Sequence, residues 1–358
     1  MLPAALALQW AASRAPEAVE RLYASALYPK LAWVLATATG AVAFSIGEWV
    51  VVLAIGGALG WLARVIVGVK AAQGRRRRAV GVAVARAASA AGLVYLAFLL
   101  LWGLNYHRPP LAVMTGLGQE TTGVALDELE ALCGELVAEA NQTRAAVAED
   151  AGGVSRLAGG VPATLVRATD AVRGAAERYP VVRGPFARAK PVLLSTGLSY
   201  LGLSGIYMPF TAEANVNAIL PDSQLPFTAA HELAHQAGIA PEDEANFVAY
   251  VACSGHPHAD FRYSGALNAG LYAVNALAQA DRPRALQVAR WSPAVRRDLD
   301  ALTAWNRRYQ GRAETAARAV NNAYLKTQGE AEGVRSYGRM VDLLILERRA
   351  RTGGSRPR

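Results

Sequence analysis

The chain has 358 residues, 53% of them hydrophobic, and its mean hydropathy is +0.17. A soluble protein of this length is usually less apolar, so a membrane portion is expected before any motif is considered. The net charge is +9, but much of the excess lies in one short run and at the C-terminus, which argues against a nucleic-acid-binding protein. The two cysteines, Cys133 and Cys253, exclude a disulfide framework and a cysteine-rich metal cage, and leave one bridge between them open.

Residues 1–48 contain only short apolar stretches. Met1 to Ala12 lacks the basic start and the cleavage site of a signal peptide. Leu31 to Phe44 is shorter than the roughly 20 residues that a membrane-crossing helix needs. The segment is therefore predicted to form short apolar or interfacial helices.

Residues 49–105 predict two transmembrane helices. Their apolar cores are Trp49 to Ala63 and Ala87 to Leu104, and Trp49 and Trp102 stand where aromatic belts are expected. The run KAAQGRRRR at residues 70–78 separates them, and dense positive charge in a short loop marks the cytoplasmic side. The sequence thus predicts a multi-pass protein of the cell membrane whose later residues lie outside the cytoplasm. The alternative is two buried helices of a soluble protein.

Residues 106–347 predict a mainly α domain with a small β-sheet. Leu126 to Asp150 and Ala163 to Arg178 have the apolar spacing of amphipathic helices. Lys190 to Asn217 holds short β-prone runs broken by glycine and proline, and helices resume near Phe227. Residues 348–358 are predicted to be a disordered basic tail.

The motif HELAH occupies residues 231–235. His231 and His235 are four apart, so on a helix both imidazoles project from one face and can bind one metal ion. Glu232 is offset by one position, so we expect it to act as the base that takes a proton from the attacking water, whose pKa zinc lowers. With only five histidines in the chain, an accidental match is improbable. A catalytic zinc ion also needs a third protein ligand.

The third ligand is sought in the helix that follows. Gly238 lets the chain reverse, and Pro241 suits the first turn of a new helix. Glu242 and Glu244 would point about 200° apart on that helix, so only one of them can face the two histidines. Glu242 is favoured because Asn246 follows one turn later on the same face and can contact and orient its carboxylate. An apolar residue follows Glu244 at that spacing.

Two further groups of residues are candidates for the substrate site. The strand-like run GIYMPFTAEANVN precedes the metal helix, and its polar residues could border the cleft or serve only strand packing: Tyr207, Glu213, Asn215 and Asn217. A group that stabilises the tetrahedral intermediate is also needed. The candidates by residue type alone are Arg262, Tyr263 and Tyr337.

These motifs resemble known families. HELAH followed by Glu242, Ala245, Asn246 and Ala249 is similar to the gluzincin metallopeptidases, in which two histidines and a downstream glutamate bind zinc, although the spacing from His235 is shorter here. More closely, the chain resembles a family of bacterial membrane proteins, a domain of unknown function that is grouped with zinc peptidases. The matching stretches are FSIGE (44–48), WGLNYHRPPL (102–111), GIYMPFTAEANVN (205–217), FRYSGAL (261–267) and YLKTQGEAEGVRSYGRMVDLL (324–344).

Together, these observations predict a membrane-anchored, zinc-dependent metallopeptidase with a zincin-like domain. It would cleave peptides or proteins outside the cytoplasm, with the lipid bilayer and the peptide substrate as its partners. The alternative is a catalytically silent, zinc-stabilised membrane protein that binds or assembles other components. The intact Glu232 favours the enzyme, since a purely structural zinc site has no use for that base.

Overall fold

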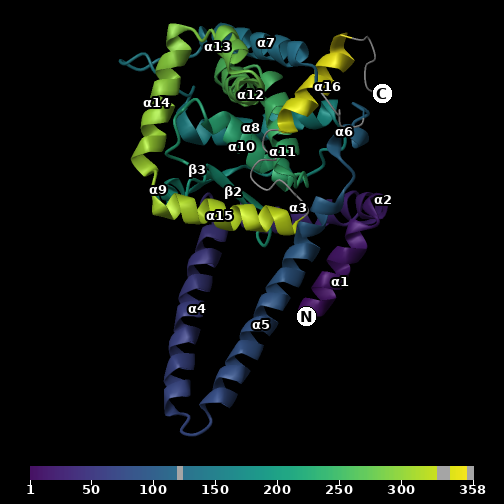
Figure 1. Cartoon of the computed structure of the whole chain (residues 1–358), viewed down its shortest axis with the longest axis vertical. Helices are drawn as coiled ribbons and strands as arrows, with labels where there is room; N and C mark the ends of the chain where they lie inside the picture. Colours follow the sequence, from purple (N-terminus) through teal and green to yellow (C-terminus); the bar gives the residue numbers. More distant parts are fainter. Residues whose placement is uncertain (119–123, 329–338, 353–358) are drawn as a thin grey trace.

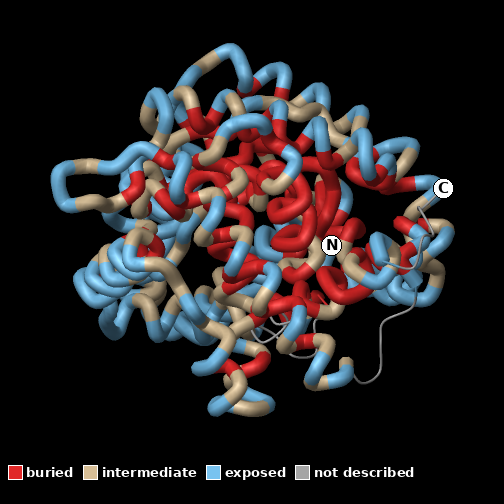
Figure 2. Tube along the Cα trace, turned by 90° about the horizontal axis from the view of Figure 1, so that it is seen from above, coloured by how far each residue is buried: buried red, intermediate tan, exposed pale blue. Residues whose placement is uncertain are grey.

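The structure is a computed structural model that describes residues 1–118, 124–328 and 339–352. Figure 1 shows a mainly helical body from which two long helices extend as a hairpin. Buried segments gather at the centre of the body, as Figure 2 shows from above. The predicted fold class, mainly α with a small sheet, is confirmed.

The hairpin consists of α4 (Ile46–Ala71) and α5 (Arg76–Leu101). Ser45 caps α4, because its side chain accepts a hydrogen bond from the backbone N–H of Glu48. Both helices are long and apolar enough to cross a membrane. The most apolar stretch of α4 has no buried residue and that of α5 has few, so the hairpin does not form the core of a soluble body.

Most of the N-terminal segment packs on the body, and its first helix lies along α5 of the hairpin (Figure 1). It contains four short helices: α1 (Leu2–Ser13), α2 (Pro16–Ala18), the π-helix η1 (Val19–Ala24) and α3 (Tyr28–Gly40). Tyr23 and Tyr28 share one buried apolar cluster with Trp102, at the end of α5, and with Tyr207 and Ala240 of the body. The short helices predicted for residues 1–48 are present. Their buried side chains form one apolar cluster together with side chains from later in the sequence.

Most of the body consists of helices, and two of them, α10 and α11, lie near its centre. These helices are η2 (Gly103–His107), α6 (Leu111–Met114), α7 (Leu126–Arg144), α8 (Gly160–Arg178), α10 (Leu225–Gln236), α11 (Glu242–Ser254), α12 (Ala259–Ala280), α13 (Arg282–Val288), α14 (Pro293–Tyr309), α15 (Arg312–Thr327) and α16 (Met340–Thr352). The main core is formed by the apolar faces of α6, α7, α8, α10, α11, α12, α13 and α16. Cys133 and Cys253 are both buried in it as free thiols.

The sheet has three strands, β1 (Lys190–Val192), β2 (Gly205–Met208) and β3 (Glu213–Asn217), and the helix α9 (Ser195–Tyr200) lies between the first two in sequence. Their order is β1-β3-β2, with β1 parallel and β2 antiparallel to β3, so β2 is an edge strand. Ala214 and Val216 of β3 are buried in the main core together with α10, so this face of the sheet covers the helix that bears HELAH.

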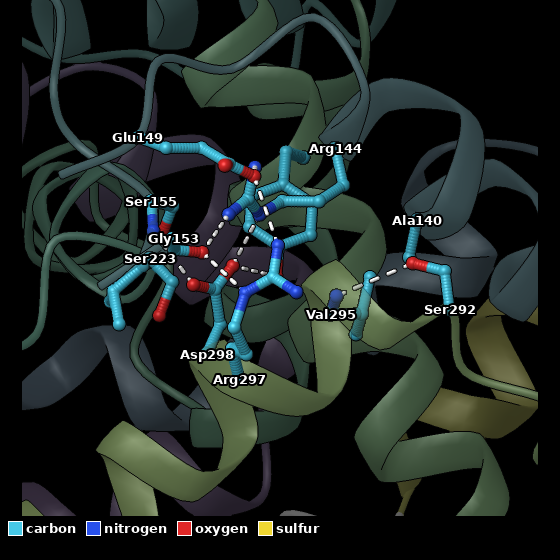
Figure 3. A network of polar contacts seen from close by, with 12 residues as sticks. Ala140, Arg144, Glu149, Gly153, Ser155, Ser223, Ser292, Val295, Arg297 and Asp298 are labelled. Atoms are coloured by element: carbon cyan, nitrogen blue, oxygen red, sulfur yellow. Dashed lines mark hydrogen bonds and ion pairs between the residues drawn. The ribbon is translucent and has the colours of Figure 1, made fainter. Parts of the chain in front are cut away.

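Helix α7 ends earlier than predicted, at Arg144, because that side chain turns into a buried polar network (Figure 3). Its Nε lies 2.6 Å from Oδ2 of Asp298, and the two side chains are 1% and 0% exposed. The backbone N–H of Ser155 donates to Oδ1 of Asp298 at 2.7 Å, and the Tyr263 hydroxyl donates to Oδ2 at 2.6 Å. The network joins α7, α12 and α14.

The predicted disordered tail begins inside a helix. Helix α16 continues to Thr352, because Arg348 and Arg349 pair with the carboxylates of Glu135 and Glu128 on α7. The tail prediction is therefore wrong for residues 348–352, and residues 353–358 lie outside the described part of the chain.

Candidate metal centre

The motif HELAH lies on α10, which the sheet and α11 cover (Figure 1). The rings of His231 and His235 are 4.6 Å apart between centroids and nearly perpendicular, as expected for one face of a helix. Gly238 has a φ of +81°, a left-handed conformation that reverses the chain after α10. Pro241 then precedes the first residue of α11, so the predicted turn and second helix are confirmed.

Glu242 completes a cluster with the two histidines. Its Oε2 lies 3.2 Å from Nε2 of His231 and 3.8 Å from Nε2 of His235. All three ligand atoms lie within 4.8 Å of one another. Atoms bound at about 2.0–2.1 Å to a tetrahedral zinc ion lie about 3.3 Å apart, so the cluster has the dimensions of a site for one ion. The predicted set of two histidines and Glu242 is therefore brought together.

The orientation of His235 also suits a metal ligand. Its Nδ1 donates to the carbonyl oxygen of Ile239 at 2.7 Å, so Nε2 is the nitrogen that faces Glu242. Burial opposes a charge on His235, but the hydrogen bond and charge of Glu242 outweigh it and raise the pKa to about 9. Burial likewise opposes ionisation of Glu242, yet the two histidines hold its pKa well below the usual range. A negative carboxylate facing two imidazoles is a setting that a cation fits.

Glu244, the alternative ligand, serves another purpose. Its Oε1 accepts a hydrogen bond of 2.6 Å from the backbone N–H of Leu111, at the start of α6. Burial, together with the neighbouring Asp243, raises the pKa of Glu244 to about 8. Asn246 is 2% exposed, and its amide nitrogen is buried without a hydrogen-bond partner in the described part of the chain. Its predicted role of orienting Glu242 stays a prediction.

Glu232 lies beside the cluster in a buried position. It is 4% exposed, and burial raises the pKa of its carboxyl group to about 7, although the two histidines oppose the rise. The strand β2 passes directly over this side chain: a Cβ added at Gly205 would lie 2.4 Å from Oε1 of Glu232. Glycine is therefore required where the edge strand crosses the candidate base.

Three side chains from early in the sequence hold the end of α10. The indole Nε1 of Trp102 donates to the carbonyl of His235 at 3.0 Å, and the hydroxyl of Tyr28 donates to the carbonyl of Gln236 at 2.8 Å. Arg108 donates to the carbonyl of Gly238 at 2.7 Å. Trp102 is 5% exposed, so its predicted place in an aromatic belt is wrong; it lies inside the protein because it supports the metal helix.

Of the predicted substrate residues, Tyr207 lies on the face of the sheet that covers α10. Side chains alternate along β2, and that of Tyr207 points to the same face of the sheet as Ala214, towards α10. Its ring lies 5.3 Å from that of Trp102, and its hydroxyl is 3.2 Å from the hydroxyl of Tyr28. Tyr207 therefore belongs to the packing behind His235.

Glu213 is not positioned to meet a substrate. One of its oxygens is 2.6 Å from Nζ of Lys190, and the other accepts a hydrogen bond of 2.6 Å from the backbone N–H of Gly47. Its carboxylate thus fixes the start of α4 to the sheet and is 2% exposed. Asn215 and Asn217 lie on the same face of β3 as Glu213, the face opposite α10, so the structure does not bring these three side chains together with the metal cluster.

The predicted electrophiles also lie elsewhere. Tyr263 belongs to the network of Asp298, and Arg262 donates to the carbonyl of His256. Tyr337 lies outside the described residues. A tyrosine that the sequence did not single out, Tyr272 of α12, is close to the cluster: burial raises its pKa well above the usual range, and the charge of Glu242 raises it further. Tyr272 comes close to Glu242 only because α12 packs on α11, which the sequence does not indicate.

Residues 23–345 match the model of a protein family described as "Protein of unknown function (DUF3810)". The match spans nearly the same stretches as the predicted resemblance to a domain of unknown function. No curated protein and no solved structure matches the chain.

Proposed function

The chain belongs to the DUF3810 family, and we propose that it is a membrane-anchored, zinc-dependent peptidase whose metal ligands are His231, His235 and Glu242. One observation carries this proposal. Two imidazoles and one carboxylate converge within 4.8 Å, and the buried carboxylate of Glu232 lies beside them. Zinc sites with three protein ligands are typical of hydrolases, because a fourth position stays open for chemistry.

The donor set favours zinc. Imidazole nitrogen and carboxylate oxygen suit this ion, and the hydrogen bond from Nδ1 of His235 to the carbonyl of Ile239 directs its Nε2 towards the site. Zinc bound to these residues would polarise the scissile carbonyl and lower the pKa of an attacking water.

Glu232 is the group that would accept the proton of that water. A general base works best when its pKa lies near the working pH, and burial brings the pKa of Glu232 to about 7. It sits one residue from His231 on the same helix, yet its oxygens contact β2 through the space left by Gly205.

A peptide is the substrate that the surroundings favour. The strand β2 lies at the edge of the sheet and crosses Glu232, so its outer edge can pair with an extended backbone. Ile206 in the same strand is 42% exposed. A peptide added there would run past the base and the metal ligands.

The hairpin supports a membrane anchor. The exposed apolar surface of α4 and α5 is unfavourable in water and favourable in lipid. The basic loop at residues 70–78 favours a cytoplasmic location for the tip of the hairpin, and the helical body is then outside the cytoplasm.

The proposal is tested with the full-length chain in detergent, incubated with a diverse peptide library with and without a chelator. We expect about one zinc ion per chain and cleavage that the chelator abolishes. The variant Glu232→Gln should keep its zinc and lose turnover by about 10²- to 10⁴-fold. Equal turnover in this variant would overturn the proposed base. Stoichiometric zinc without any chelator-sensitive cleavage would favour the silent binding protein.

A further inference from the structure

The two helices of the hairpin flank an open cavity of about 700 Å³ near their connecting loop. They converge towards this loop and separate towards the body, as Figure 1 shows. Four of the residues that line the cavity are arginines: Arg64 from α4, Arg75 just before α5, and Arg78 and Arg86 from α5. Gly68 also lines it, and a Cβ added there would meet no atom within 4 Å, so the space between the helices is open.

The hairpin has no negative charge to balance these arginines. No aspartate or glutamate occurs between Trp49 and Asn105. The nearest acidic residue, Glu48, lies at the opposite end of α4, where its carboxylate accepts hydrogen bonds from the backbone N–H groups of Leu193 and Leu194. A counter-charge for the cavity must therefore come from outside the hairpin.

Two of the arginines lie well inside the apolar span. Arg64 is seven residues before the end of α4 and Arg86 ten residues after the start of α5, which places them about 10 and 15 Å along the helices from the loop. Cations at this depth are unfavourable in a bilayer unless they reach the interface or meet an anion. Both line the same cavity, so one anion can serve both.

We propose that this cavity binds the head group of an anionic phospholipid, with the phosphate held by arginines from both helices. Guanidinium groups bind phosphate oxygens in pairs of hydrogen bonds, and basic pockets between membrane helices on the cytoplasmic side are suited to such lipids. The inference relies on the membrane crossing proposed above and is independent of the metal centre.

The walls favour a lipid over a free phosphate ion. Between the arginines the cavity is lined by apolar side chains, among them Val65, Val69 and Val82. A free ion would leave this surface unfilled, whereas the acyl chains of a phospholipid would cover it while the head group meets the arginines.

The test uses the full-length chain in mild detergent and measures bound lipid by native mass spectrometry during titration with dioleoyl phosphatidylglycerol. The test variant is Arg64→Gln/Arg86→Gln. The matched control is Arg76→Gln/Arg77→Gln, which removes the same charge from the same hairpin at positions that do not line the cavity. The test variant keeps the basic loop, so the direction of insertion should not change.

We expect the Kd for phosphatidylglycerol to rise at least about tenfold in the test variant and less than about threefold in the control, because bidentate phosphate contacts are lost only in the first. Phosphatidylcholine should bind more weakly than phosphatidylglycerol, and inorganic phosphate should not compete. Equal losses in both variants, equal binding of the two lipids, or competition by inorganic phosphate would each overturn the proposal. Circular dichroism and zinc content establish that both variants are folded. If the test variant is not folded, Arg75→Gln/Arg78→Gln replaces it with the same expected rise.

Discussion

The substitution Gly205→Ala should act on Glu232 alone. The added Cβ would lie 2.4 Å from Oε1 of Glu232 and 2.7 Å from both its Cδ and its Cγ. Ordinary contacts between such atoms are at least about 3.4 Å, so the carboxylate or the strand must move by about 1 Å. Gly205 does not have a left-handed φ, so alanine introduces no backbone strain of its own.

Two effects of known size follow from this displacement. Overpacking by one methyl group costs about 1–3 kcal/mol of unfolding free energy. In a chain of this size, that corresponds to a fall in Tm of about 2–6 °C. A misplacement of about 1 Å in a reacting group lowers kcat by about 100-fold. Zinc affinity should be unchanged, because the three metal ligands are not displaced.

The assay is a double-mutant cycle read by thermal unfolding. In a Glu232→Ala background the added methyl group has no carboxylate to meet, so Gly205→Ala should then lower Tm by less than about 1 °C. Gly197→Ala is the matched control, since a Cβ at that position meets no atom within 4 Å. If Gly205→Ala lowers Tm equally with and without the Glu232 side chain, the contact between β2 and the candidate base is not as described.

Three other substitutions give separate expectations. Glu242→Gln should weaken zinc binding by at least about 100-fold in a competition titration, whereas Glu244→Gln should leave it unchanged, because an amide oxygen can still accept from the backbone N–H at α6. Trp102→Phe removes one of the hydrogen bonds to the carbonyl of His235, which keeps the bond from the backbone N–H of Gly238, and should lower the unfolding free energy by about 1 kcal/mol, while Trp49→Phe, at a half-exposed site, should have no effect on thermal unfolding. Arg144→Met leaves a buried carboxylate uncompensated and should cost about 3–5 kcal/mol in denaturant unfolding, with zinc content unchanged in the fraction that folds.

The candidate metal ligands could be predicted because they depend on local regularities. Helical spacing places His231 and His235 on one face, and Gly238 and Pro241 mark a turn that brings the chain back towards them. The same periodicity limits the third ligand to one of Glu242 and Glu244, and the preference for Glu242 depended on Asn246 one turn later. The apolar runs and the small sheet were likewise visible, because each is a property of consecutive residues.

The surroundings of the metal ligands could not be predicted because they depend on distant parts of the chain. The bond between Trp102 and the carbonyl of His235 joins residues 133 positions apart, and the side chain of Trp102 equally fits a membrane interface. The position of Glu213 could not be predicted for the same reason. A carboxylate in a strand looks alike in sequence whether it faces a cleft or caps a helix that begins 167 residues earlier.

The supports of α10 also impose an order of assembly. Tyr28 and Trp102 leave the ribosome long before His235, and in the proposed topology Trp102 reaches its final position only after α5 has inserted. In that topology α10 lacks the support of Trp102 until the hairpin is in the bilayer. The proposed hydrolase would then mature only where it is anchored, so chains that fail to insert would also fail to gain activity in the cytoplasm.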